Sequence, residues 1–342
     1  MDVPDVGIGS NDSRRRDRVS SEIEVEGLSL LAPGIRALQV AMPGGHIPYS
    51  LCYLIEDARG DVHLIDPGWS SDANWAALSR ALAASGHAID DVASIVVTHL
   101  HPDHLGMADR VRAASGAALV LHEREQAALH AMAGRAPAES AEHRFDEWGV
   151  PADRLPELDV SAGRPPMDAQ LPADLLVADG DLLDIPGRTV QVVWTPGHTP
   201  GHSCLVDAED GLVFTGDHVL PTIHPGLGLG GETATNPIAD YLASLDRIAA
   251  FDDLQVCPGH EYVFRGLAER CASTAEHHLR RSREVAERLR IDGDPTVWQV
   301  ASELTWTAGW ANLNGFYLLS ALAQTAMHLD FVASEAWAAR ER

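Results

Sequence analysis

The most constraining feature of this chain is a run of polar side chains that directly follows a short apolar segment. A Ser-Ile-Val-Val run ending at Val97 predicts a buried β-strand, and residues 98–104 then read Thr-His-Leu-His-Pro-Asp-His. Three imidazoles and a carboxylate so close together would be costly to bury alone, and a divalent cation is a partner that suits these donors. Because His99 and His101 alternate along an extended segment whereas Asp103 and the next histidine begin a helix, this one segment can serve two ions.

Three further positions repeat the pattern of a short β run, a Gly or Pro turn and a ligand residue. His198 lies in Trp-Thr-Pro-Gly-His, Asp217 in Phe-Thr-Gly-Asp and His260 in Cys-Pro-Gly-His. Taken singly, such a residue is more often part of a turn than a metal ligand. In this order, after residues 98–104, the three positions predict one metal centre assembled at four strand ends.

The first half of the chain alternates between strand and helix signals. Short β-forming runs lie at 35–42, 50–56 and 62–65. A helical pattern over 72–85 comes next, then the strand ending at Val97, a helix over 103–115, a strand over 118–121 and a helix over 123–132. Strand, helix and buried strand in this order indicate an α/β layered fold.

The second half is again rich in strands and then becomes helical. Strand candidates lie at 175–177, 189–194, 203–206, 212–215 and 255–257. Asn236-Pro237 is a good helix start, and from residue 263 the signal is helical, with a capping box at Thr296 and Gln299. Between about 134 and 172 weak periodicity predicts an inserted helix and a long loop, a candidate cover for the substrate.

With these motifs, the chain resembles the metallo-β-lactamase fold superfamily over about residues 35–270. The likeness rests on Asp66 in Leu-Ile-Asp-Pro-Gly, on the His-x-His-x-Asp-His run, and on His198, Asp217 and His260. It implies an α/β fold of the αββα sandwich type, with the metals at one edge of two sheets. The helical C-terminus is similar to the winged-helix-like appendage of some members.

The resemblance implies a role for each motif residue. One metal takes His99, His101 and His198, the other takes Asp103, His104 and His260, and Asp217 bridges them. Asp66 and Asp103 are expected to serve catalysis, Asp66 by supporting the ligands and Asp103 by returning a proton to the leaving group. Two divalent ions, Zn²⁺ by default with Fe or Mn as alternatives, would activate a bridging hydroxide.

The resemblance also narrows the substrate. Antibiotic-hydrolysing members that bind metal through a cysteine would carry it near Asp217, where this chain has an aspartate, so β-lactamase activity is not expected. The glyoxalase II type is closer, which implies cleavage of a thioester, ester or lactone of a small or acyl-carrier substrate. Residues beside the ligand motifs are candidates for substrate contacts: His46, Tyr49, His202, His218, His224 and Tyr262.

The composition of the chain limits which binding partners and which cellular location are expected. Asp and Glu outnumber Lys and Arg by 50 to 25, so nucleic acid is an unfavoured partner and a phosphodiesterase or ribonuclease is only the alternative function. Without a signal peptide, a membrane span or a CxxC pair, the expectation is a cytoplasmic protein with reduced thiols. The expected domains are an arm over 1–22, a catalytic domain over 23–290 and a helical module over 291–342 that could form a homo-oligomer.

Overall fold

The computed structural model describes residues 23–340 except 26, 45–46, 134–138, 159–170 and 232. The expected arm over 1–22 and the candidate His46 lie outside the described residues, as do parts of the 134–172 insert. Within the described ranges, no helix has the length and apolar character needed to cross a membrane.

The larger β-sheet, as far as the chain is described, has eight strands that lie side by side in sequence order. They are β1 Ile23–Val25, β2 Leu28–Ala32, β3 Ile35–Ala41, β4 Tyr49–Glu56, β5 Val62–Ile65, β6 Val92–Val97, β7 Ala118–His122 and β8 Leu175–Val177. Strands β1 to β5 pair antiparallel, whereas β5 to β8 pair parallel. Parallel neighbours need crossover connections, which helices supply here.

The smaller sheet has the order β12, β11, β10, β9. Its strands are β9 Val190–Trp194, β10 Ser203–Asp207, β11 Leu212–Gly216 and β12 Gln255–Pro258. Helix α6 (Pro237–Ile248) connects the parallel pair β11 and β12. The expected start of α6 is confirmed, because the Asn236 side chain accepts hydrogen bonds from the first backbone N–H groups of the helix.

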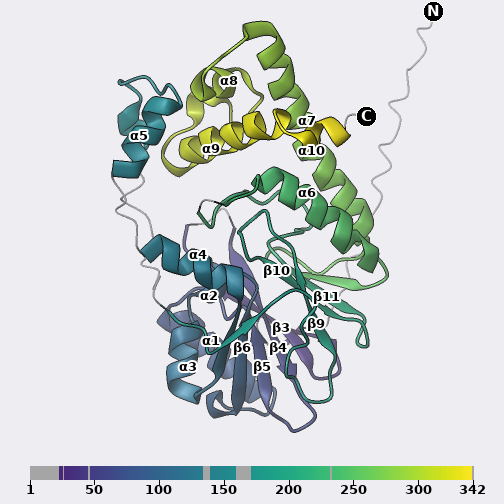
Figure 1. The fold of residues 1–342 in the computed structure, drawn as a ribbon. Helices are drawn as coiled ribbons and strands as arrows, with labels where there is room; N and C mark the ends of the chain where they lie inside the picture. Colours follow the sequence, from purple (N-terminus) through teal and green to yellow (C-terminus); the bar gives the residue numbers. More distant parts are fainter. Residues whose placement is uncertain are drawn as a thin grey trace, which may run out of the picture.

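Apolar clusters show that the two sheets are stacked between helices. Tyr53 of the larger sheet meets Phe214 of the smaller one, with ring centroids 4.9 Å apart. Helices α1 (Asp72–Ala84), α3 (Ala108–Ser115) and α4 (Glu123–Ala133) pack on the outer face of the larger sheet. Helix α6 and the start of α7 (Leu267–Asp292) pack on the outer face of the smaller sheet. The predicted αββα sandwich is therefore confirmed (Figure 1).

One helix expected from the sequence is wrong. The span 103–115 is divided into α2 (Pro102–Leu105) and α3, with the break at Gly106. Two long-range hydrogen bonds impose the break, since Met107 N donates to Gly68 O at 2.9 Å and Gly68 N donates to His104 O at 3.1 Å. A side chain at Gly106 would also press on the backbone of Gly68, so tertiary contacts override the local helical pattern here.

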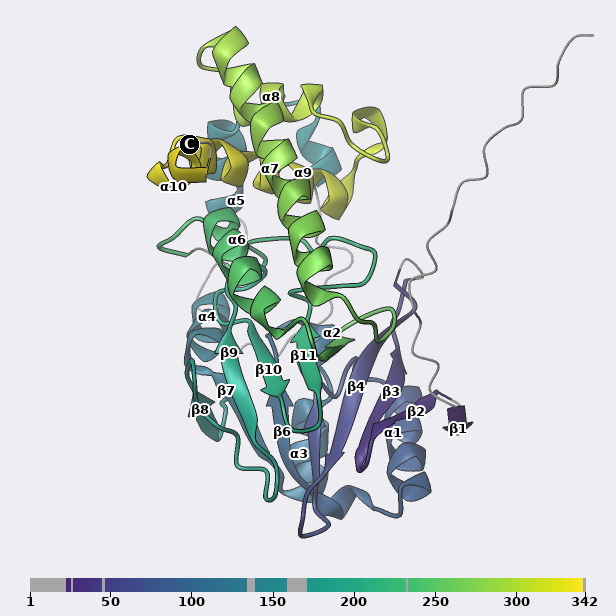
Figure 2. The same ribbon diagram turned by 90° about the vertical axis from the view of Figure 1, so that its right-hand side faces the viewer.

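The C-terminal helices form a separate layer above the sandwich (Figure 2). It comprises most of α7, α8 (Val297–Glu303), α9 (Gly315–Val332) and α10 (Glu335–Arg340). The capping box of Thr296 and Gln299 is confirmed. Residues 267–340 are all described and contain helices but no strand, which confirms the helical C-terminal appendage expected from the sequence.

The 134–172 insert contributes to this helical layer. After helix α5 (Glu139–Glu147), Trp148 O accepts a hydrogen bond from Trp298 N at 2.9 Å. Val150 and Leu158 pack in one apolar cluster with residues of α8 and α9. The insert and the C-terminal helices thus share a core, while the domain boundaries expected from the sequence stay a prediction.

Candidate metal centre

Four strands deliver the predicted ligands to one edge of the sandwich. Strands β9 and β11 both run antiparallel to β10, and β11 runs parallel to β12, so these three end at the same edge. Strand β6 of the facing sheet ends beside them, since Ser203 N at the start of β10 donates to Thr98 O at 3.0 Å. The turns that follow β6, β9, β11 and β12 carry the ligand residues.

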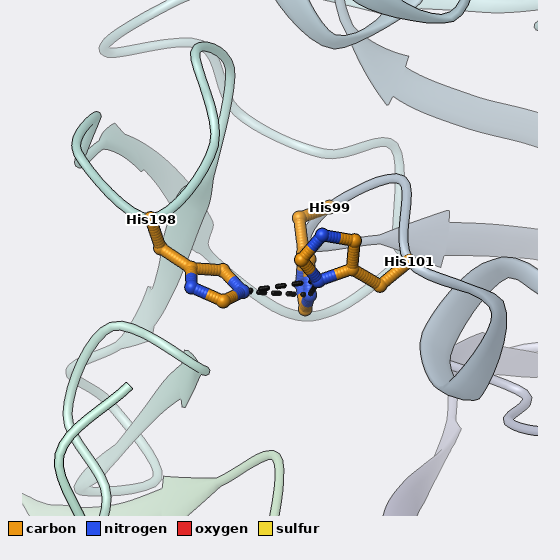
Figure 3. Close-up of side chains that lie close together, drawn as sticks. All are labelled: His99, His101 and His198. Atoms are coloured by element: carbon orange, nitrogen blue, oxygen red, sulfur yellow. Dashed lines mark hydrogen bonds between the residues drawn. The ribbon is translucent and has the colours of Figure 1, made fainter. Parts of the chain in front are cut away.

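One ligand set consists of three imidazoles whose nitrogens face one another (Figure 3). His99 Nε2 and His101 Nδ1 are 3.0 Å apart, and His198 Nε2 lies 3.3 Å and 3.1 Å from these two atoms. Ligand nitrogens at about 2.0–2.1 Å from a tetrahedral zinc ion lie roughly 3.3 Å from one another. The spacing therefore suits a shared cation.

A second set lies where α2 meets the end of β12. Asp103 Oδ2 is 3.3 Å from His260 Nε2 and 3.8 Å from His104 Nε2. His104 and His260 are buried, and Asp103 is partly exposed. This mixed set of two imidazoles and one carboxylate is a second candidate for a divalent cation.

Asp217 lies between the two sets and offers one carboxylate oxygen to each. Its Oδ1 is 3.4 Å from His104 Nε2 and 3.3 Å from His260 Nε2. Its Oδ2 is 3.6 Å from His198 Nε2 and 4.0 Å from His99 Nε2. This arrangement would allow Asp217 to be shared between two cations.

Hydrogen bonds on the outer nitrogens show that these side chains fit a metal. His198 Nδ1 contacts Gly226 O at 2.6 Å and His260 Nδ1 contacts Tyr49 O at 3.0 Å. Because a carbonyl oxygen only accepts, each Nδ1 carries a proton, which leaves Nε2 as the ring atom that a cation could bind. Among the described residues, buried His104 Nε2 and Asp217 Oδ1 have no hydrogen-bond partner, which suits atoms that would bind a cation.

The sequence model of the metallo-beta-lactamase superfamily matches residues 48–260, more than half of the chain and all seven of these side chains. This chain belongs to the metallo-beta-lactamase superfamily. The superfamily match and a relative named hydroxyacylglutathione hydrolase indicate that this chain is a hydrolase.

Curated relatives in the superfamily are distant. The chain is 35% identical over 191 residues to a hydroxyacylglutathione hydrolase of Xylella fastidiosa, covering 53% of this chain and 67% of that one. It is 24% identical over 249 residues to a beta-lactamase-like protein 2 homolog of Caenorhabditis elegans, covering 72% of this chain and 68% of that one. A match to an atrochrysone carboxyl ACP thioesterase of Aspergillus fumigatus is 30% identical but spans about a third of either chain, 33% and 34%.

Solved superfamily structures agree over a longer span. A metallo-beta-lactamase family protein from Thermus thermophilus superimposes with a TM-score of 0.72 at 29% identity, covering 89% of this chain and 94% of that one. A beta-lactamase domain protein from Burkholderia ambifaria gives 0.67 at 27% identity, covering 89% and 88%. Both matches therefore include part of the helical layer as well as the sandwich.

Asp66 contacts one of the predicted metal ligands without belonging to either ligand set. It adopts a left-handed backbone conformation, with φ of 52°, at the turn after β5. Its Oδ1 accepts from Thr98 N at 2.8 Å, and its Oδ2 lies 2.7 Å from Thr98 Oγ1 and 2.8 Å from His104 Nδ1. Asp66 thus fixes the orientation of His104 and acts through it, which makes Asp66 a positioning residue.

The two ligand sets differ in their protonation. Burial, followed by the neighbouring His198, lowers the pKa of His101 to about 4, so His101 is neutral at pH 7. Burial also opposes protonation of His260, but Asp217 and Asp103 outweigh it and raise the pKa of His260 to about 10. A cation that binds at His260 would therefore displace a proton.

Two of the predicted substrate residues lie beneath the site. His202 is fully buried and its Nε2 accepts a hydrogen bond from Asp217 N at 3.2 Å. His218 is also fully buried, with its ring 4.8 Å from that of Tyr241. His202 therefore supports the backbone of Asp217, and a direct contact of either histidine with substrate stays a prediction.

The other candidates lie at different distances from the ligands. The Tyr49 hydroxyl donates to Glu261 O at 2.8 Å, directly beside the His260 turn. Tyr262 packs, half-buried, against the cluster beneath α6. His224 stacks on His277 of α7, with ring centroids 4.0 Å apart, and is not among the residues of either ligand set. Their contacts with substrate remain predictions.

Glu125 is a supporting residue that the sequence analysis missed. It lies in the first turn of α4, is fully buried, and accepts hydrogen bonds from both ligand loops. Leu100 N donates at 2.9 Å from the loop of His99, while Thr199 Oγ1 donates at 2.5 Å and Gly201 N at 2.7 Å from the loop of His198. Burial raises the pKa of Glu125 to about 7 although all three bonds favour the carboxylate.

Replacing Glu125 by glutamine is expected to weaken the coupling between these two loops. The amide has a single acceptor oxygen, so its NH₂ group would face one of the three donors and leave that donor unpaired at a cost of about 1–3 kcal/mol. We expect a lower unfolding temperature and about 10- to 100-fold weaker metal binding. Thermal denaturation and competition with a metal indicator would measure both, with exposed Glu123→Gln on the same turn as the control. Unchanged metal affinity in Glu125→Gln would contradict this role.

Proposed function

We propose that this chain is a dinuclear metal-dependent hydrolase that cleaves the thioester, ester or lactone of a small or carrier-linked substrate. The observation that carries the proposal is Asp217, whose two oxygens face two separate ligand sets. Relatives named hydroxyacylglutathione hydrolase and carboxyl ACP thioesterase support the thioester class. The cytoplasmic location expected from the sequence stays a prediction.

The residues would hold two cations as follows. His99, His101 and His198 would bind one, Asp103, His104 and His260 the other, and Asp217 both. Zinc suits such imidazole-rich donors, and iron or manganese accept the same ligands. When bound, a pair of such ions lowers the pKa of water toward neutrality and polarises the scissile carbonyl.

The chain's own side chains add orientation and proton transfer. Burial opposes ionisation of Asp103, but His104 and His260 outweigh it and lower the pKa of Asp103 to about 2, so it is a carboxylate at neutral pH. Because a pKa of about 2 makes Asp103 a weak base, it would hold a proton only briefly, while relaying it from water to a departing thiolate or alkoxide, and its partial exposure gives it access to that water. Asp66 keeps His104 in place during this transfer.

Cleavage of a phosphodiester at the same metal centre is the alternative function. The formal charge of −25 disfavours a polyanionic substrate, because a nucleic acid would approach a surface of its own sign. A homo-oligomer through the C-terminal helices is a separate proposal, which the solution molecular mass would test.

A substrate panel tests the proposed function. The metal content of the purified chain would be measured first, and the same preparation would then be offered acyl-thioesters, lactones, a cephalosporin reporter and a bis-aryl phosphodiester. We expect turnover of thioesters or lactones, with the cephalosporin and the phosphodiester at least 100-fold slower in kcat/KM. Preferred cleavage of the phosphodiester would overturn the thioester class while leaving the metal centre intact.

A further inference from the structure

A small cavity lies within the helical layer, apart from the metal ligands. Its volume is about 150 Å³, enough for several water molecules or a compact ion. It is lined by α7, by the segment after α8 and by α9, through residues that include His277, His278, Arg281, Trp306 and His328. Exposed Thr307 places part of the wall at the protein surface.

The lining carries one permanent positive charge, on Arg281, whereas the chain as a whole is acidic. Three histidines and an arginine contribute to it, and no carboxylate does. Acidic residues nevertheless outnumber basic ones two to one in the sequence. Burial, followed by the charge of Arg281, lowers the pKa of His328 to about 3, so His328 is neutral at pH 7.

His278 is the side chain whose environment calls for a ligand. The side chain is only 2% exposed. Its Nε2 is buried and has no hydrogen-bond partner in the described part of the chain. An unpaired buried polar atom is unfavourable, so a hydrogen-bond partner in the cavity would stabilise this side chain.

Neighbouring contacts hold the rest of the lining in place. His328 Nδ1 lies 2.9 Å from Ser282 Oγ, whose own proton goes to His278 O at 3.1 Å, so His328 is the donor in this pair. The Arg281 guanidinium stacks 4.6 Å from the centre of the Trp306 ring. It also contacts Glu284 at 3.2 Å and Thr305 O at 2.5 Å, which leaves others of its five N–H donors for a ligand.

We propose that this cavity binds an oxyanion, namely a carboxylate or phosphate group, between Arg281 and His278. Arg281 supplies the permanent charge and fork-shaped donors that suit such groups. His278 Nε2, which has no hydrogen-bond partner in the described part of the chain, would donate an N–H in the tautomer that carries its proton there. The group could belong to the far end of a substrate or be a free ion, and the chemistry of recognition is the same.

Inorganic phosphate is the probe. Calorimetric titration of the metal-loaded full chain is compared with the variants Arg281→Met, His278→Gln and Arg283→Met. Arg283 lies on the same helix, pairs with Glu276 and does not line the cavity, so Arg283→Met is a control with the same change in charge. Phosphate that binds the metal centre itself is common to all four proteins and cancels in the comparison.

We expect Arg281→Met and His278→Gln to lose a phosphate-binding event, or to weaken it at least tenfold, while Arg283→Met keeps it. Thermal unfolding checks that each variant is folded, and a variant that is not is replaced by Arg281→Lys, which keeps the charge but not the fork. Equal phosphate binding in all four proteins, or an equal loss in Arg283→Met, would overturn the proposal.

Two thioesters distinguish the sources of the oxyanion. One has coenzyme A as its phosphate-bearing thiol and the other has uncharged N-acetylcysteamine. If the cavity holds the end of a substrate, Arg281→Met raises KM at least fivefold for the first only, and if it holds a free ion, both KM values stay unchanged. If the titration shows that Arg281→Met loses phosphate binding, the cavity is an oxyanion site with either KM result, and the KM values decide only where the oxyanion comes from. This arm depends on the proposed thioesterase function, whereas the titration does not.

Discussion

Replacing Asp217 by alanine is expected to reduce the metal content from about two ions per chain to one or none and to lower kcat/KM by about a thousandfold or more. Asp217 is the only one of the seven predicted ligands whose atoms approach both ligand sets through different oxygens. Its loss also leaves buried His104 and His260 without their main negative neighbour. A loss of about 4 kcal/mol in transition-state stabilisation corresponds to this rate effect.

Elemental analysis and steady-state kinetics would measure these effects on one preparation. Exposed Asp90 provides the matched control, because Asp90→Ala removes the same side chain far from the ligand sets. Two ions per chain in folded Asp217→Ala, with activity near that of Asp90→Ala, would disprove the bridging role.

Removing the metal with a chelator is expected to abolish hydrolysis and to lower the free energy of unfolding. The donor atoms of seven mostly buried side chains would then face one another, with His99 Nε2 and His101 Nδ1 only 3.0 Å apart. Ions that bind only the folded chain stabilise it by about 4 kcal/mol at a concentration a thousandfold above Kd. Thermal unfolding with and without chelator, followed by addition of zinc, iron or manganese, measures the effect and identifies the metal that restores activity.

The variant Asp217→Ala is an internal control for this second experiment. If the ions stabilise the fold through the predicted ligands, chelator should shift the unfolding temperature of this variant much less than that of the unaltered chain. Full activity after prolonged chelation, in protein shown to be metal-free, would rule out a metal-dependent reaction.

The sequence was most informative where the chemistry of a side chain and its place at a strand end coincide. His198, Asp217 and His260 each follow a short β-strand. Because these three strands run in the same direction in one sheet, their carboxyl ends lie at the same edge, whatever the sequence between them. The αββα layering was predictable for a similar reason, because alternation of strands and helices leaves few ways to cover both sheets.

What could not be predicted depends on contacts between distant segments. A glutamate in the first turn of a helix is common, so nothing local marks Glu125 as the residue that joins two ligand loops. The break at Gly106 is set by hydrogen bonds with Gly68, far earlier in the chain. Likewise, the burial of His278 depends on how α9 packs on α7, which periodicity alone does not determine.

The shared core of the insert and the C-terminal helices limits how this chain can be recombined with its relatives. Val150, Leu158 and Trp148 pack with residues that follow them by more than 130 positions, including Ala301 and Leu318. A chimera that exchanges only the last fifty residues would set these apolar side chains against a foreign surface. A functional exchange must transfer residues 139–158 together with the C-terminal helices, because the two segments pack as one structural unit although strands β8 to β12 lie between them in the sequence.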